Sequence, residues 1–108
     1  MTLNEYQRSA RSTAQYPKHM ALPYVFLGLS GEAGEICNKY KKIIRDKNNK
    51  LEDEDVRQIQ MELGDVMWYL AAAHDALGLE MEQTMALNLN KLSLRQKRGK
   101  IAGDGDER

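Results

Sequence analysis

The sequence predicts an all-α protein, and three observations support that prediction. Only two prolines, Pro17 and Pro23, occur in the 108 residues, and both lie near the N-terminus. Apolar residues recur at three- and four-residue steps through most of the chain, which is the period of an amphipathic helix. No stretch shows the apolar–polar alternation of a half-buried strand. At this length we expect one modest domain rather than two.

Four helices are expected from these periodicities, at about residues 2–15, 23–45, 53–77 and 80–98. Thr2 suits the N-cap of the first helix, and Pro23 suits the first position of the second. Gly78 and Gly99 follow the third and fourth helices as C-terminal stops. Residues 1–98 are therefore expected to form a single domain, and residues 99–108 a glycine-rich, charged tail.

Each of the last three helices has an apolar stripe that is expected to face the core. On the second helix it is Phe26, Leu29, Ala33, Ile36, Tyr40 and Ile43 or Ile44; on the third Val56, Ile59, Leu63, Val66, Leu70, Ala73 and Leu77; on the fourth Met81, Met85, Leu89 and Leu92.

Composition excludes several classes of protein. Sixteen basic and sixteen acidic residues give no net charge, so no overall field attracts nucleic acid or an anionic membrane. Cys37 is the only cysteine, which rules out an internal disulfide framework and fits a reducing compartment. No apolar run approaches the roughly 20 residues of a membrane span. The prediction is a cytoplasmic protein without nucleic-acid or membrane partners.

The linker DKNNKLEDED between the second and third helices resembles a calcium loop only superficially. Counted from Asp46, position six would be Leu51 instead of glycine, and position twelve would be Arg57 instead of glutamate. We therefore interpret it as a solvated connection.

Two pairs of carboxylates lie beside the apolar stripes. Glu32 and Glu35 share one helix face because they are three residues apart, and the same holds for Glu62 and Asp65. If the two helices pack, the four carboxylates converge at the edge of the core and repel one another. Oxygen ligands without cysteine or histidine favour a hard divalent cation, Mg²⁺ or Mn²⁺. Solvated faces of charged helices are the alternative interpretation.

Glycines and lysines extend this pattern. Gly28, Gly31, Gly34 and Gly64 each cost a helix roughly 1 kcal/mol relative to alanine, which indicates close approach of another backbone or of a ligand. Lys39 and Lys42 follow Glu35 at three- and four-residue steps. Carboxylates followed by ammonium groups suit a metal-bound polyphosphate, although ordinary pairing of Glu35 with Lys39 also explains the spacing.

Other catalytic schemes fit poorly. A di-iron bundle needs Glu-x-x-His, whereas Ala71 precedes His74 and Tyr16 precedes His19 by three residues. The sequence contains no Walker loop, no G-x-S-x-G and no set of zinc ligands.

The stretches GLSGEAGE and ELGDVMWYLA together resemble the MazG-like family of all-α nucleoside triphosphate pyrophosphohydrolases. That family has the acidic pairs E-x-x-E and E-x-x-D on consecutive helices, here Glu32 with Glu35 and Glu62 with Asp65. NLNKLSLRQKRG is similar to a family segment that contains Asn, Lys-Leu and Arg, here Asn88, Lys91, Leu92 and Arg95. The resemblance covers the chain from about Leu22 onward.

The resemblance implies hydrolysis of a nucleotide between its α- and β-phosphates, with Mg²⁺ bound by Glu32, Glu35, Glu62 and Asp65. It implies phosphate contacts from Lys39, Lys42, Lys91 and Arg95, and sugar, base or phosphate contacts from Asn88 and Tyr69. It further implies a four-helix core built across a homodimer, often within a dimer of dimers.

Two alternatives stay open at this stage. The same chemistry can serve another substrate, such as phosphoribosyl-ATP or deoxyuridine and deoxycytidine nucleotides. A catalytically silent helical interaction module is the alternative from a different class. The base preference, the sugar preference and the number of metal ions are not determined by the sequence.

Overall fold

The structure is a computed structural model that describes residues 1–99 and 101–106. Within those residues it contains helices and no strand, which confirms the all-α prediction. The elements are α1 (Leu3–Arg11), the short 3-10 turn η1 (Lys18–Met20), α2 (Ala21–Lys47), α3 (Asp53–Leu77) and α4 (Met81–Lys97).

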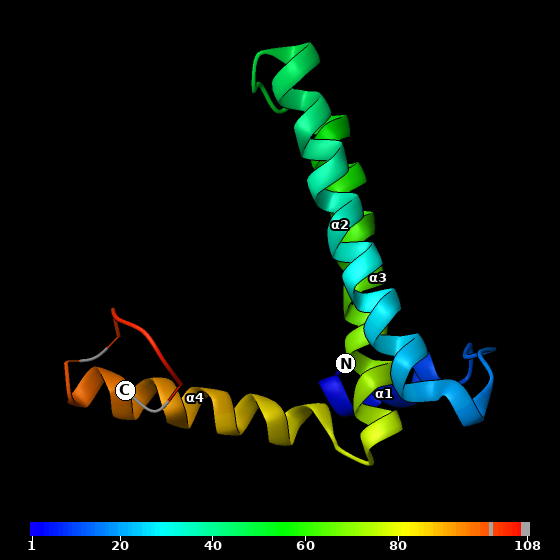
Figure 1. Cartoon of the computed structure of the whole chain (residues 1–108), viewed down its shortest axis with the longest axis vertical. Coiled ribbons are helices and arrows are strands. Elements are labelled where there is room, and N and C mark those ends of the chain that lie inside the picture. Colours follow the sequence, from blue (N-terminus) through cyan, green and yellow to red (C-terminus); the bar gives the residue numbers. More distant parts are fainter. Residues whose placement is uncertain (100, 107–108) are drawn as a thin grey trace.

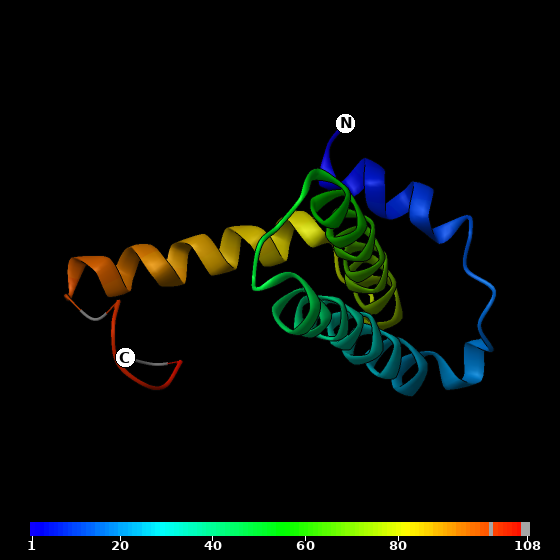
Figure 2. The same ribbon diagram turned by 90° about the horizontal axis from the view of Figure 1, so that it is seen from above.

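A long antiparallel hairpin of α2 and α3 dominates the molecule (Figure 1). Helix α1 packs across the end of α3 near the N-terminus of α2, and α4 leaves that end at a steep angle to the hairpin (Figure 2). Helix α4 contacts α1 and has no substantial contact with α2 among the described residues. No described helix is both long and apolar enough to cross a membrane.

The helix ends follow the local chemistry of the sequence. The Thr2 hydroxyl accepts a hydrogen bond from the Glu5 backbone N–H at 3.1 Å, as expected for an N-cap. Helix α1 ends at Arg11, four residues earlier than predicted. Helix α2 begins at Ala21, so Pro23 lies inside its first turn. Backbone N–H groups in a first turn have no acceptor within the helix, so the missing N–H of proline costs no hydrogen bond there. Gly78 ends α3 with a φ of 71°, a conformation that glycine adopts without strain.

Gln7 fixes the junction of α1, α3 and α4. Its side chain is 3% exposed. Its Nε2 donates to Asp75 Oδ1 at 2.8 Å and to the Leu79 carbonyl at 2.9 Å, and its Oε1 accepts from the Met81 backbone N–H at 2.8 Å. The amide therefore satisfies one of the free N–H groups at the start of α4. Because Gln7 is on α1, these hydrogen bonds also hold the start of α4 in a fixed position relative to α1 and α3.

Two small clusters of mostly small side chains form the core of the single chain. One contains Ala10, Ala71 and Met81, and the other contains Val25, Ala72 and Ala73. Ala73, Met81 and Ile43 were expected to be buried and are. Ala10, which the sequence places on the apolar face of the first helix with Leu3 and Tyr6, is also buried. Of the other buried apolar residues, Val25, Ala71 and Ala72 lie outside the predicted stripes.

Most of the predicted stripe residues are exposed, so the predicted core was largely wrong for the isolated chain. Phe26 on α2 and Leu63 on α3 are each 49% exposed, and on α4 Leu89 is 64% exposed. The reason is that α2 and α3 are apolar on more than one side. The sides that meet in the hairpin contain Val25, Glu32 and Ile43. Most of the other residues of the predicted stripes turn away from it.

The shape of the chain is correspondingly open. The radius of gyration is 17.0 Å, compared with roughly 13 Å for a compact domain of this length. The accessible surface is 8054 Å², compared with roughly 6,100 Å² for a compact monomer of this mass. The chain therefore exposes much more surface than a self-contained globule.

Candidate active site

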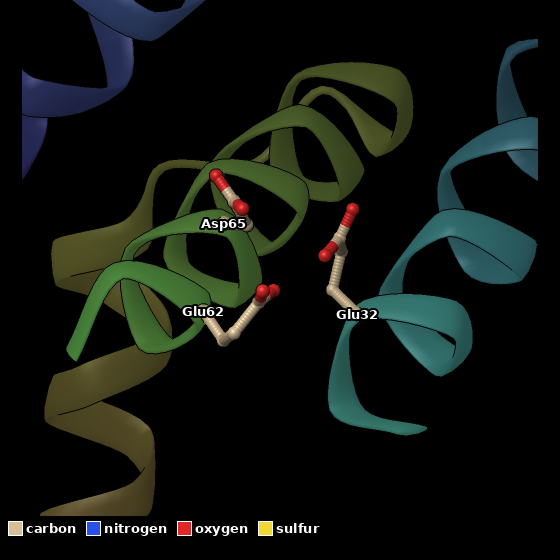
Figure 3. A group of neighbouring side chains, drawn as sticks. All are labelled: Glu32, Glu62 and Asp65. Atoms are coloured by element: carbon tan, nitrogen blue, oxygen red, sulfur yellow. The ribbon is translucent and has the colours of Figure 1, made fainter. Parts of the chain in front are cut away.

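Three carboxylates meet where α2 and α3 face each other. Glu32 comes from α2, and Glu62 and Asp65 lie one turn apart on α3 (Figure 3). Each offers an oxygen within 4.8 Å of an oxygen of the other two. We call these three residues the carboxylate cluster. Glu35 is exposed one turn further along α2 and lies outside the cluster, so the structure brings together three of the four predicted carboxylates.

The environment of Glu32 disfavours the charged form of its carboxyl group. Partial burial raises the pKa of Glu32 above its ordinary value, and the charge of Asp65 and a hydrogen bond with Glu62 raise it further. The cluster thus holds more negative charge than its surroundings neutralise. Its donor atoms are all carboxylate oxygens, which is the ligand chemistry that hard divalent cations such as Mg²⁺ prefer. The residues present fit such an ion.

Lys39 is the positive charge that lies against the cluster. Its Nζ lies 3.4 Å from Glu62 Oε1 and donates a hydrogen bond to Gln58 Oε1 at 3.0 Å. Gln58 was not predicted as a site residue. It precedes Glu62 by four residues and so shares its helix face, a spacing from which its position is predictable.

Beyond Lys39 the hairpin forms a cleft of about 290 Å³, which we call the basic cleft. Lys47 pairs there with Asp55 at 2.9 Å. Lys42, which was predicted to contact phosphate, also lines this cleft. The residues that line it are Lys39, Lys42, Ile43, Asp46, Lys47, Asp55 and Gln58.

On the opposite side of the cluster lies an open pocket of about 320 Å³, the aromatic pocket, lined by Thr13, Glu32, Asp65, Trp68 and Tyr69. Trp68 Nε1 donates to Thr13 Oγ1 at 2.7 Å. The rings of Trp68 and Tyr69 meet edge to face with centroids 5.0 Å apart. Thr13 was not predicted because it follows α1, about 50 residues before Asp65 in the sequence, and no local pattern links the two.

Gly28 shows why Tyr69 can occupy its position. A Cβ atom at residue 28 would lie 2.1 Å from Tyr69 Cε1, so the ring fits only because glycine is present. Burial raises the pKa of Tyr69, and its neighbour Tyr24 raises it further, so its hydroxyl stays protonated at neutral pH. Gly31, Gly34 and Gly64 have nothing within 4 Å of such a Cβ. The expected close approach is therefore found at one of the four glycines.

The remaining predicted residues lie on a different part of the chain. Asn88, Lys91 and Arg95 are on α4, which points away from the hairpin (Figure 1). Lys91 and Arg95 bind Asp106 of the tail instead of the cluster. One copy of the chain therefore does not bring these three residues to the carboxylates.

The fold and the site define a class: an all-α protein with a carboxylate cluster between two antiparallel helices. A family model described as the MazG nucleotide pyrophosphohydrolase domain matches residues 24–99. The chain is also 46% identical to the Gene 37 protein of Mycobacterium phage L5 over 114 aligned positions that cover both chains completely. No solved structure matches the chain significantly. The chain belongs to the MazG nucleotide pyrophosphohydrolase family, as its motifs indicated.

Proposed function

We propose that this protein hydrolyses ribo- or deoxyribonucleoside triphosphates between the α- and β-phosphates. The products are a nucleoside monophosphate and pyrophosphate, and the role is control or sanitising of the nucleotide pool. The observation that carries the proposal is the order of chemistry along the hairpin: aromatic pocket, carboxylate cluster, basic cleft. A nucleotide has the same order, with an apolar base, then the phosphates to be cleaved, then the outer phosphates.

The acidic residues have two roles in this proposal. Glu32, Glu62 and Asp65 would hold Mg²⁺, or Mn²⁺ in its place, and Glu35 on the adjacent turn would be a fourth ligand. Such an ion would supply charge neutralisation at the phosphates and would lower the pKa of a water molecule at the site. A cluster carboxylate oxygen orients the attacking water and accepts its proton. The water oxygen bonds to the α-phosphorus, the bond from that phosphorus to the bridging oxygen breaks, and pyrophosphate leaves.

The basic and aromatic residues bind the rest of the nucleotide. Lys39 and Lys42 meet the outer phosphates as charged donors. Tyr69 contacts the base or sugar. To determine the base preference, the substrate panel includes phosphoribosyl-ATP and deoxyuridine and deoxycytidine nucleotides.

We also propose that the active form is a homodimer or a dimer of dimers. The exposed surface exceeds that of a compact monomer by about 2,000 Å², and large apolar side chains such as Phe26, Leu63 and Leu89 remain uncovered. A second copy of the chain is the partner that fits this surface, because it exposes the same apolar side chains and both copies bury them on association. Sedimentation velocity should give at least twice the 12.3 kDa of one chain. Full activity in a monomer would contradict this proposal.

The decisive test of the reaction is product analysis over the eight common ribo- and deoxyribonucleoside triphosphates, deoxyuridine triphosphate and phosphoribosyl-ATP, with Mg²⁺ and with EDTA. Metal-dependent release of monophosphate and pyrophosphate is the expected result. Orthophosphate with a diphosphate would place the cleavage elsewhere and overturn the proposal. Glu62→Gln should abolish release and keep the helical circular dichroism of the wild type. If no nucleotide is hydrolysed and no Mg²⁺ binds, the chain is the silent helical module.

A further inference from the structure

The tail returns to α4 and places a carboxylate on two of its basic residues. Lys91 Nζ lies 3.2 Å from Asp106 Oδ1, and Arg95 Nη2 lies 3.3 Å from the same oxygen. Arg95 Nη2 also donates to the backbone carbonyls of Gly105, at 3.4 Å, and of Asp106, at 2.5 Å. One carboxylate oxygen is therefore shared between two cations. We call residues 101–106 the tail strap.

The guanidinium of Arg95 is only partly satisfied by this arrangement. Its side chain is 5% exposed. Among the described residues, its Nε is a buried side-chain donor without an acceptor. A desolvated charged donor is costly to leave unpaired. Within residues 1–99 and 101–106, every acceptor on Nη2 comes from the tail strap, so a group with more oxygens would satisfy this site better. A phosphate group has the charge and the oxygens that the site lacks.

Asp106, in contrast, is weakly held. Its side chain is 87% exposed, so solvent and salt screen both of its ion pairs. Hydrogen bonds from Lys91 and Arg95 lower the pKa of this carboxyl, which keeps it charged at neutral pH. Gly103 and Gly105 have φ values of 121° and 88°, and they let the strap reverse direction. Such a contact is easily exchanged for a stronger anion.

We propose that Asp106 is an internal competitor for phosphate at Lys91 and Arg95, the two residues to which the family's motif assigns phosphate contacts, and that a phosphate group displaces it. That the phosphate belongs to a nucleotide or to its pyrophosphate product rests on the proposed function. Closure by Asp106 does not, because it follows from the contacts of α4 with the strap. The strap therefore tunes how tightly phosphate groups bind to α4.

Isothermal titration of inorganic pyrophosphate into metal-free protein tests the competition directly. Asp106→Asn removes the competing charge and should tighten binding about two- to fivefold, the range expected for exposed ion pairs. Asp104→Asn is the matched control, since it removes the same charge two residues away and has no ion pair with a described residue. It should bind like the wild type. Equal or weaker binding by Asp106→Asn than by the control would overturn the proposal.

Amide NMR tests whether pyrophosphate binding releases the tail strap. Pyrophosphate should shift the Gly103 and Gly105 amides of the wild type toward the positions they have in free Asp106→Asn, because both states release the strap. Lys91→Met should abolish the shift. Unmoved glycine amides at saturating pyrophosphate would also overturn the proposal. These measurements do not depend on catalytic turnover. If the protein hydrolyses no nucleotide but still shows the tighter binding and the amide shifts, the proposed function is refuted and the proposal for Asp106 stands.

Discussion

The Lys39 ammonium lies 3.4 Å from Glu62 Oε1, and so joins the carboxylate cluster to the basic cleft. Both side chains are largely shielded from solvent, with 31% of Lys39 and 16% of Glu62 exposed. The interaction is therefore less screened than that of a surface pair. The relationship places one positive charge at the boundary between the proposed metal ligands and the proposed outer-phosphate site.

Replacing Lys39 by methionine tests that boundary. The variant keeps most of the aliphatic volume and loses the charge, so we expect kcat/KM to fall about tenfold, the value of one charge-assisted hydrogen bond. Steady-state kinetics with the best substrate of the panel measures the change. Lys41→Met is the control, because Lys41 lies in an apolar surface groove with Ile36 and Tyr40 instead of the basic cleft. An equal loss in both variants would remove Lys39 from the site.

Partial burial of Glu32, together with repulsion from Asp65 and Glu62, should be visible in the stability of the metal-free protein. Its pKa is higher in the folded chain than its ordinary value of 4.5, so the folded state binds more protons and stability falls as pH rises through this range. Glu32→Gln should therefore raise the metal-free Tm at pH 7 by about 1–3 °C and leave it unchanged near pH 3.

Calorimetry across pH, with and without Mg²⁺, measures this effect. Wild-type protein should gain stability from Mg²⁺, and Glu32→Gln should gain less. Glu35→Gln should change the metal-free Tm less than Glu32→Gln, because Glu35 is exposed outside the cluster. A lower Tm for metal-free Glu32→Gln at pH 7 would contradict the repulsion.

Gly28 and Gly31 differ in what an added methyl group meets. Gly28→Ala forces a Cβ into the Tyr69 ring, so we expect a destabilisation of about 1–3 kcal/mol by overpacking. Gly31→Ala meets nothing within 4 Å and removes a helix-breaking residue, so it should stabilise by up to about 1 kcal/mol. Chemical denaturation measures both. A destabilising Gly31→Ala would show that this side of α2 is covered in the oligomer.

The sequence predicted the helices well because their signals are local. The Thr2 cap, the Gly78 stop and the bounds of α3 depend on residues within a few positions of one another. The acidic pairs were predictable for the same reason, since three-residue spacing fixes a shared helix face. Which carboxylates meet was not, because Glu32 and Glu35 both satisfy the spacing and only the packing of α2 on α3 selects Glu32.

The core was poorly predictable because periodicity does not say what a stripe packs against. Val25 is fully buried while its neighbour Phe26 is 49% exposed, although a hydrophobic stripe favours the larger residue. More than half of the residues in the predicted stripes are exposed in the single chain. The hydrogen bonds of Gln7 could not be predicted either, because its partners are about 70 residues away in the sequence. A buried polar residue also produces no periodic pattern in the sequence.

Removing the Gln7 amide should loosen the junction at which α4 begins. Gln7→Ala leaves the Met81 N–H and the Leu79 carbonyl without their partner, so we expect a loss of about 2 kcal/mol or more. Gln60→Ala, on the exposed side of α3, should change stability by less than about 0.5 kcal/mol. Urea denaturation compares the two. Equal midpoints would mean that the Gln7 network contributes nothing to the fold.

Mixing two inactive variants tests whether α4 serves the site of another copy. Helix α4 of one chain points away from that chain's own hairpin, so in the proposed dimer Arg95 reaches a carboxylate cluster only across the interface. Glu62→Gln lacks one carboxylate of the cluster, and Arg95→Ala lacks the guanidinium group on α4, so each variant alone should be nearly inactive. After subunit exchange, half of the dimers carry both changes, and each of these has one site with Glu62 and the partner's Arg95 intact. Activity should then recover to about a quarter of the wild-type value. Recovery should track the fraction of mixed dimers seen by native mass spectrometry. Exchange without recovery would show that Arg95 does not act across the interface.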